Sequence, residues 1–342
     1  MKQNVTMRDI ADKLGVSVVT VSKAINDKDG VSDELRKKVK TIAEETGYRF
    51  NALAKSMKEG LSYNIGIIVS ERFTDITQTF YMQFYQVLAK VLDENHYSGI
   101  LHILSLEDED QLVLPRIYHE RKVDAFIILG QLDHRYLDMF LETDTPLVFL
   151  DFYTDCPDVD CVIMDNFYGM YDLTNYLVKR GHQDIAYVGN IHSTSSILDR
   201  YLGYYKSMLE HGIPVPNDYV ISDRDDQGQF IDLQLPEQIP TAFVCICDQI
   251  AYHLVTLLQK KGYRVPEDCS VVGFDNGIFA TLTEPGLTTV EVNITEMAKS
   301  VVSLIVKKVK NPNISYGRVT VKGKIIYRNS VKDLHNPETI TV

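Results

Sequence analysis

Short apolar runs of strand length recur between residues 61 and 342, and stretches with helical periodicity separate them. The runs are IGIIV (65–69), GILHIL (99–104), DAFIILG (124–130), PLVFLD (146–151), DIAYVG (184–189), TAFVCICD (241–248) and SVVGFD (270–275). A strand that is apolar at every position is buried on both faces, which is typical of a parallel sheet covered by helices. This part of the chain therefore predicts an α/β fold of doubly wound parallel sheets.

The strands are too many for one open sheet, so we expect two lobes. The expected N-lobe comprises 62–164 and 292–327, and the expected C-lobe comprises 165–291 and 328–342. The chain would then cross between the lobes near Met164–Asp165, near Val290–Val292 and around Tyr327–Ser330.

Polar residues follow several of the apolar runs. Ser70 follows the first run, Asp151, Asp248 and Asp275 end later ones, and Arg200 lies at the start of a predicted helix. In parallel sheets, ligands bind outside the carboxyl ends of the strands. Carboxylates accept hydrogen bonds from hydroxyls and arginine donates two, so the set suits a polyhydroxyl ligand. Each aspartate can instead cap a helix; capping is the favoured interpretation for Asp248, and ligand contact for Asp275.

The first sixty residues carry a net charge of +3, whereas the rest of the chain carries −15. Capping residues at Thr6, Ser17 and Ser32, with Gly15 ending the first segment, predict three short helices. The first two, separated by a glycine-containing turn, are typical of a helix-turn-helix. A small basic unit on an acidic body indicates that this unit meets a polyanion.

The second predicted helix turns Val21, Ala24 and Ile25 inward and leaves Val18, Val19 and Lys23 outward. Lysine can donate to guanine, and valine can pack on a thymine methyl group. Hydroxyl and amide side chains can contact phosphates, which set the register on DNA; these are Thr6, Ser17, Thr20, Ser22 and Asn26. The alternative is a three-helix module that binds another protein.

Two adjoining segments, TMRDIADKLGVSVVTVSKAIND and VSDELRKKVKTIAEETGYRFNALAKSMKEG, resemble the headpiece of the lactose-repressor (LacI/GalR) family. The resemblance implies a DNA-binding headpiece at 1–49 and a hinge helix at 50–61. It places Val18, Val19 and Lys23 at the family's base-reading positions, with lysine where the family often has arginine. In the hinge it implies DNA contacts from Ala54, Met57 and Lys58, with Met57 inserted into the minor groove as an apolar wedge.

The body resembles the effector-binding core of the same family, which is itself like a periplasmic sugar-binding protein. TFYMQFY, VFLD, DRYLGY and GFDN are the matching motifs, and they imply an effector site of Phe80, Tyr81, Asp151, Arg200 and Asp275. Cys247, which we also expect at the effector site, stands where relatives often have a ligand-contacting asparagine. The chain has no tryptophan, and SDRDDQGQF (222–230) has no clear counterpart in the family.

The resemblance implies a transcriptional repressor that binds a near-palindromic operator as a homodimer and is controlled by a small-molecule effector. Because Arg200 is the only cation expected at the site, we expect a neutral sugar. A phosphorylated sugar or a purine as the effector, or a cytoplasmic sugar-binding protein, are the alternatives. The start of the chain has no signal-peptide pattern, so a cytoplasmic location is expected. No glycine-rich phosphate loop or nucleophile elbow is present in the sequence. We therefore expect no enzyme activity, no cofactor, no metal ion and no membrane association.

Overall fold

The structure is a computed structural model that describes residues 5–25, 27–48, 56, 59–74, 80–156, 159–225 and 228–336. The chain forms two compact units, Met1–Ser62 and Tyr63–Val342, which we call the headpiece and the core. The predicted DNA-contacting residues Asn26, Ala54, Met57 and Lys58 lie outside the described residues.

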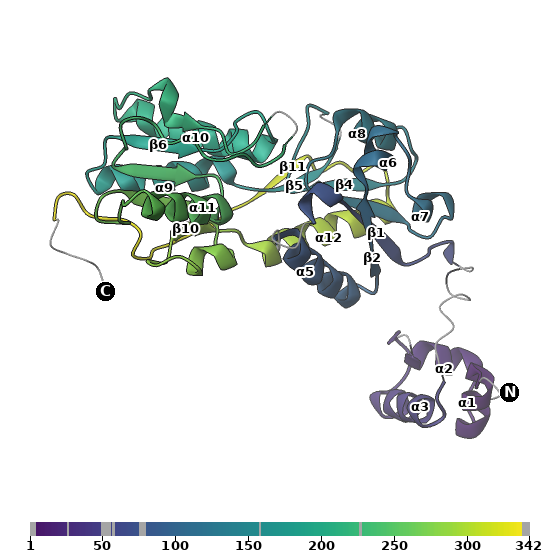
Figure 1. The fold of residues 1–342 in the computed structure, drawn as a ribbon. Coiled ribbons are helices and arrows are strands. Elements are labelled where there is room, and N and C mark those ends of the chain that lie inside the picture. The colour runs from purple at the N-terminus through teal and green to yellow at the C-terminus, as the bar shows by residue number, and fades with distance from the viewer. Residues whose placement is uncertain are drawn as a thin grey trace. The chain divides into compact units, whose positions relative to one another are not determined.

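The described part of the headpiece contains the helices α1 (Met7–Leu14), α2 (Val18–Ile25) and α3 (Asp33–Glu45) (Figure 1). Thr6 caps α1, because its side chain accepts from the N–H of Asp9 while Asp9 Oδ2 accepts from the N–H of Thr6 at 2.7 Å. Gly15 ends α1 with φ 65°, in the left-handed region that favours glycine. Ser17 Oγ accepts from the N–H of Thr20 at 3.0 Å at the start of α2. The predicted helix limits are confirmed at these positions.

A small apolar core holds the headpiece helices together. All three helices contribute to it, and its buried members are Ile10, Ala11, Val21, Ala24 and Val39. Burying these side chains is the main force that stabilises such short helices, which are marginal alone in water. The inward position predicted for Val21 and Ala24 is confirmed, and Ile25 packs against the same core while partly buried.

A parallel six-stranded sheet of order β11-β5-β4-β3-β1-β2 forms the first half of the core, which we call the N-lobe. Its strands are β1 (Asn64–Ser70), β2 (Ser98–Leu104), β3 (Ala125–Leu129), β4 (Leu147–Leu150), β5 (Cys161–Met164) and β11 (Arg318–Val321). Helices α5 (Phe80–Glu94) and α12 (Ile294–Lys310) pack against each other beside this sheet. The shorter helices are α6 (Leu106–Asp110), α7 (Arg116–His119) and α8 (His134–Leu141).

A second six-stranded sheet of order β12-β10-β9-β8-β6-β7 forms the other half, the C-lobe (Figure 1). Its strands are β6 (Ile185–Val188), β7 (Val220–Ile221), β8 (Ala242–Cys245), β9 (Ser270–Asp275), β10 (Thr288–Glu291) and β12 (Lys324–Ile326). All of them are parallel except β12, which pairs antiparallel with β10. Its helices are α9 (Asn166–Lys179), α10 (Ser195–Glu210) and α11 (Asp248–Lys260).

The chain passes from one sheet to the other three times: between β5 and α9, between β10 and α12, and between β11 and β12. The third crossing lies earlier than the sequence suggested. Lys324 already pairs with Glu291 of the C-lobe sheet, so the N-lobe ends before residue 324 and not at 327. The expected α/β class with parallel sheets is confirmed. No helix in the described part of the chain is long and apolar enough to cross a membrane.

Candidate ligand pocket and headpiece surface

A cavity of about 900 Å³ in the core is lined by loops that follow strands of both sheets. The N-lobe contributes residues after β1, β3 and β4, and the C-lobe contributes residues after β6, β8 and β9. These are the carboxyl ends of parallel strands, where ligands bind in open α/β sheets. Among the predicted effector residues, those that line it are Phe80, Tyr81, Asp151, Arg200, Cys247 and Asp275.

Asp151 is a buried carboxylate directly after β4, with φ 71°. The hydroxyl of Tyr81 donates to its Oδ2 at 2.9 Å, whereas Oδ1 has no hydrogen-bond partner among the described residues. Burial raises the pKa of Asp151 to about 6, against the opposing effects of Arg200 and of the bond from Tyr81. A left-handed backbone at a non-glycine residue and an unpaired buried oxygen are both unfavourable, and such features concentrate at binding sites.

Arg200 and Asp275 lie side by side in the wall of the same cavity. Nη2 of Arg200 lies 3.4 Å from Oδ1 of Asp275, and Nε donates to Oδ1 of Asn166 at 2.8 Å. The guanidinium also lies over the ring of Phe274, 3.9 Å from its centroid, and donates to the carbonyl of Ile246. These contacts fix its plane, so Arg200 is a rigid donor at the cavity wall.

Asp275 ends β9 with φ 101°, and the N-cap of the following 3-10 helix, Ile278–Thr281, is Gly277. Burial raises the pKa of Asp275 to about 7, Arg200 lowers it, and the charge of Asp151 raises it further. Two carboxylates with raised pKa values thus lie beside one arginine at the ends of strands from different lobes. Such a set both donates to and accepts from a polar ligand.

Aromatic rings and a thiol complete this part of the wall. The rings of Phe80 and Tyr81 meet edge to face, with centroids 5.3 Å apart. Cys247 stands at the N-cap position of α11, and burial raises the pKa of its thiol to about 12. The thiol therefore stays neutral and offers the cavity a weakly polar surface.

Two sequence-based interpretations need correction. Ser70 does not line the cavity: its hydroxyl donates to Oε2 of the buried Glu109 at 3.0 Å, so it is committed within the N-lobe. Asp248 does line the cavity, but it does not cap α11. Its Oδ2 accepts from the N–H of Gly277 at 2.8 Å and its Oδ1 from the hydroxyl of Thr289 at 2.6 Å, which ties α11 to the loop after β9 and to β10.

The structure also brings polar and aromatic residues to the cavity that the sequence did not single out: Arg72, Gln131, Asn190, Arg224 and Phe230. The last two belong to 222–230, the segment without a counterpart in the family. Arg224 pairs with Asp223 at 2.7 Å and lies over the ring of Phe230, 4.9 Å from its centroid. The signal that points to them is topological, because they follow β7 at the carboxyl edge of the C-lobe sheet.

The headpiece presents its own candidate surface on α2. Val19 is 65% exposed although apolar, and Val18 and Lys23 are exposed beside it. Ser17 and Thr20 join their hydroxyls at 2.8 Å, and Ser22 is partly buried. Exposed valines next to a lysine near the start of a second helix match the composition of a recognition helix in a DNA major groove.

Comparisons with known proteins match both units. Residues 6–51 match the model of bacterial regulatory proteins of the lacI family, and residues 174–331 match that of a periplasmic binding protein-like domain. The transcriptional regulator RegA of Clostridium saccharobutylicum is 30% identical over 334 residues, 95% of this chain and 98% of that protein. The transcriptional repressor PurR of Photobacterium profundum is 29% identical over 343 residues, 96% of this chain and 99% of that protein.

The fold is shared with a crystal structure of the lac repressor dimer bound to operator and the anti-inducer ONPF. The TM-score is 0.72 at 22% identity, over 96% of this chain and 99% of that one. A helix-turn-helix headpiece joined to a two-lobed ligand-binding core defines a DNA-binding transcriptional repressor with an effector-binding domain. The chain belongs to the LacI family, as its sequence motifs indicated.

Proposed function

We propose that this repressor binds a neutral sugar in the cavity of the core and that the sugar controls its binding to DNA. The observation that carries the proposal is that Asp151, Asp275 and Arg200 line one cavity, with Arg200 3.4 Å from Asp275. Oδ1 of Asp151 is buried without a partner among the described residues, and a sugar hydroxyl supplies the donor that this oxygen lacks.

Rings along the cavity suit the apolar face of a sugar. Phe80, Tyr81 and Phe230 all line it, and Phe230 is exposed. A ring covers the C–H groups of a pyranose while carboxylates and guanidinium groups bind its hydroxyls. A purine also stacks on aromatic rings, so the rings alone do not separate the two ligand classes.

Charge balance favours a neutral ligand. Three arginines line the cavity, two more than the sequence suggested, but each has an acidic partner. Arg72 lies 2.7 Å from Glu109, Arg200 lies 3.4 Å from Asp275, and Arg224 lies 2.7 Å from Asp223. A phosphate or carboxylate would therefore meet balanced guanidinium groups and further carboxylates, which penalises an anion.

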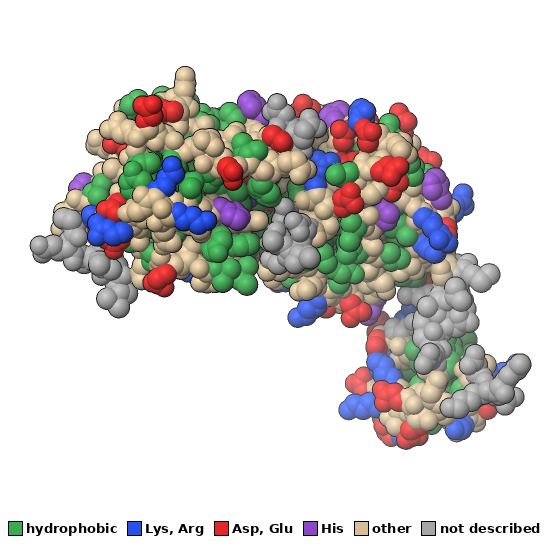
Figure 2. All heavy atoms as spheres, viewed as in Figure 1, with side chains coloured by type: hydrophobic (Ala, Val, Ile, Leu, Met, Phe, Trp, Pro, Cys, Tyr) green, Lys and Arg blue, Asp and Glu red, His purple; other side chains and the backbone are tan. Residues whose placement is uncertain are grey.

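The DNA-bound form is proposed to be a cytoplasmic homodimer on a near-palindromic operator. Two headpieces would read half-sites about one helical turn apart through Val18, Val19 and Lys23. The lac repressor in the similar structure is a dimer on operator DNA. Figure 2 shows apolar side chains gathered over β2 and α5 on the face in view, and Ile103 of β2 is exposed, as expected for a surface that meets a second copy.

The effector would act by changing the relative position of the two lobes, because its contacts come from both. A coupling free energy of about 1–3 kcal/mol between effector binding and DNA binding is enough to switch operator occupancy. The hinge segment 50–61, with Met57 as the proposed wedge in the minor groove, is the part of the chain through which this change would reach the headpieces.

A thermal-shift screen of the full chain tests the proposal. The panel holds neutral mono- and disaccharides, sugar phosphates, nucleobases and amino acids. We expect a neutral sugar to raise the Tm with concentration, and to change operator binding in a gel-shift assay. A Tm increase with a purine or a sugar phosphate alone would retain the repressor but contradict the neutral sugar.

A further inference from the structure

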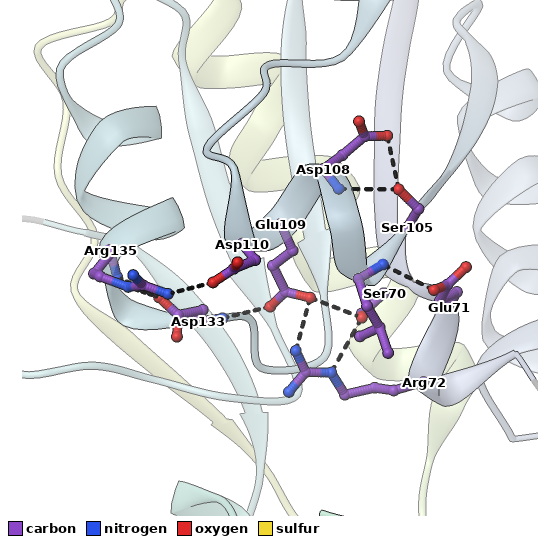
Figure 3. Close-up of polar contacts among 10 residues, drawn as sticks. Ser70, Glu71, Arg72, Ser105, Asp108, Glu109, Asp110, Asp133 and Arg135 are labelled. Carbon is purple, nitrogen blue, oxygen red and sulfur yellow. Dashed lines mark hydrogen bonds and ion pairs between the residues drawn. The ribbon is translucent and has the colours of Figure 1, made fainter. Parts of the chain in front are cut away.

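Glu109 is a buried carboxylate that joins three loops at the carboxyl edge of the N-lobe sheet (Figure 3). It lies on α6, after β2, and is 2% exposed. Its Oε1 accepts from the N–H of Asp133, after β3, at 2.6 Å. Its Oε2 accepts from the hydroxyl of Ser70, at the end of β1, at 3.0 Å and lies 2.7 Å from Nη2 of Arg72. Glu109 therefore fixes the loops that carry Arg72 and Asp133 to the cavity.

Only one edge of the Arg72 guanidinium is engaged by the N-lobe. Nη2 pairs with Glu109, and Nε donates to Oγ of Ser70 at 3.1 Å. Nη1 makes no hydrogen bond or ion pair with any residue that the structure describes, and in Figure 3 the remaining terminal nitrogen points away from both partners. Arg72 lines the cavity and its side chain is 41% exposed. A planar guanidinium held along one edge offers its other edge as an oriented pair of donors.

The positive charge of this guanidinium is balanced by the carboxylate of Glu109. Glu109 is excluded from water, so its field acts at short range with little screening. Nearby, Arg135 pairs with both Asp110 and Asp133, and Asp133 lines the cavity, so the two arginines and three carboxylates of this cluster carry a net charge of −1. An uncharged oxygen can accept from Arg72 at no electrostatic penalty. A carboxylate in the same place would lie beside a cluster with one more carboxylate than arginine, and this excess negative charge offsets its attraction to Arg72.

We propose that Arg72 is a specificity-determining residue of the effector site and that Glu109 is its positioning residue. Arg72 donates to a hydroxyl or ring oxygen of the effector. Because Glu109 balances its charge, the pair selects neutral sugars against sugars that carry a carboxylate at this end of the cavity. The inference rests on the proposed function and goes beyond it, since it assigns the discrimination between sugar classes to one ion pair.

The test measures binding of matched neutral and acidic sugars to the full chain by isothermal titration calorimetry. The probes are D-glucose with D-glucuronate, D-galactose with D-galacturonate, and cellobiose with cellobiouronate. Wild-type protein is expected to prefer the neutral member of the pair that binds. Glu109→Gln keeps the shape of the side chain but leaves the charge of Arg72 unbalanced. This variant should shift the affinity ratio towards the acidic member by about tenfold, the size of one charge-assisted hydrogen bond.

Asp110→Asn is the matched control. Asp110 lies next to Glu109 on α6 and its side chain is 77% exposed, and the substitution removes one negative charge, as Glu109→Gln does, while Arg135 keeps its pair with Asp133. Its effect on the ratio should be small because solvent screens it. Arg72→Gln should weaken binding of the neutral sugar by about tenfold. The double variant Arg72→Gln with Glu109→Gln should not show the shift in affinity ratio towards the acidic sugar that Glu109→Gln shows alone.

An unchanged ratio in Glu109→Gln would overturn the inference and leave the proposed function intact. If Glu109→Gln does not fold, Arg72→Gln still tests the inference, because replacing a partly exposed side chain should leave the fold intact. Unchanged affinity of Arg72→Gln for the neutral sugar would then overturn the inference. If none of the six sugars binds wild-type protein while a purine does, the proposed sugar effector fails and the inference fails with it.

Discussion

The hydroxyl of Tyr153 donates a 2.8 Å hydrogen bond to Oδ1 of Asp199 and so joins the two lobes of the core. Tyr153 follows β4 of the N-lobe, whereas Asp199 lies on α10 of the C-lobe. The guanidinium of Arg318 covers the tyrosine ring, 3.8 Å from its centroid. Nearby, the hydroxyl of Ser196 donates to the carbonyl of Asp151 at 2.8 Å. Burial raises the pKa of Tyr153 to about 12, so it remains a donor at neutral pH.

Removing this hydroxyl should weaken effector binding. Tyr153→Phe deletes one partly buried bond between the lobes, which disfavours the arrangement in which both lobes reach the ligand. We expect the effector Kd to rise about fivefold, for a bond worth ~1 kcal/mol. Isothermal titration calorimetry measures the change. The control is Tyr205→Phe. Tyr205 is exposed and lies on α10, the helix that carries Asp199, and this variant should bind the effector as wild type does. Equal affinities for Tyr153→Phe and wild type would contradict a role of this bond in closure.

Arg200→Ala should abolish the effector response and leave operator binding without effector nearly intact. The substitution removes the guanidinium that faces Asp275, and the predicted DNA contacts lie in the headpiece, a separate compact unit. The measurement is a gel shift on operator DNA with rising effector. Arg264→Ala removes an exposed arginine elsewhere in the C-lobe and controls for general loss of positive charge. If Arg200→Ala still responds at the wild-type effector concentration, Arg200 does not contact the ligand.

Local patterns predicted the parts of this molecule that depend on neighbouring residues. Thr6 and Gly15 marked the limits of a helix, and the apolar runs marked strands. Helix caps and buried strands require particular residue types at neighbouring positions, so they can be recognised in the sequence. Asp151 and Asp275 were found because strand ends converge in a parallel sheet.

Long-range contacts explain what the sequence did not predict. Ser70 occupies the expected strand end, but its hydroxyl is bound to Glu109 from the loop after β2. Arg224 reaches the cavity because Asn190 donates to its carbonyl at 3.0 Å from the loop after β6. The early crossing at Lys324 depends on antiparallel pairing with Glu291. None of these contacts has a periodicity or motif along the chain.

Asp275 should make the stability of the ligand-free core depend on pH. Its pKa is about 7 in the folded chain and 3.8 ordinarily, so the folded state binds the proton more tightly. The stability that this proton contributes is fully present below about pH 4 and is lost as the pH rises through about 7. Asp275→Asn stays uncharged. The Tm of Asp275→Asn minus that of wild type should therefore be larger at pH 8 than at pH 5.

Thermal unfolding at both pH values checks this prediction. The quantity compared is the difference in Tm between Asp275→Asn and wild type, which cancels a constant contribution from the contact with Arg200. A difference that does not change between pH 5 and pH 8 would show that Asp275 titrates at its ordinary pKa.

Two valines on α2 should separate DNA recognition from headpiece folding. Val19 is exposed, so Val19→Ala should leave the Tm of the headpiece unchanged but weaken operator binding by roughly tenfold, for the loss of about two buried carbons at a thymine methyl. Val21 is fully buried, so Val21→Ala should destabilise the headpiece by about 1–3 kcal/mol. Fluorescence anisotropy and thermal melts measure the two effects. Equal Tm losses in both variants would contradict the assignment of Val19 to the DNA-facing side.

Met57 tests the proposed hinge wedge. An apolar side chain inserted between base steps stabilises only the bent, specific complex, whereas phosphate contacts dominate non-specific binding. Met57→Gly should therefore reduce operator affinity far more than affinity for non-operator DNA. Since glycine also disfavours a helix by about 1 kcal/mol relative to alanine, Met57→Ala is the matched variant that removes the wedge but retains helix propensity. If the wedge matters, Met57→Ala loses most of the same specific affinity. Equal losses on operator and non-operator DNA would instead assign Met57 to general binding.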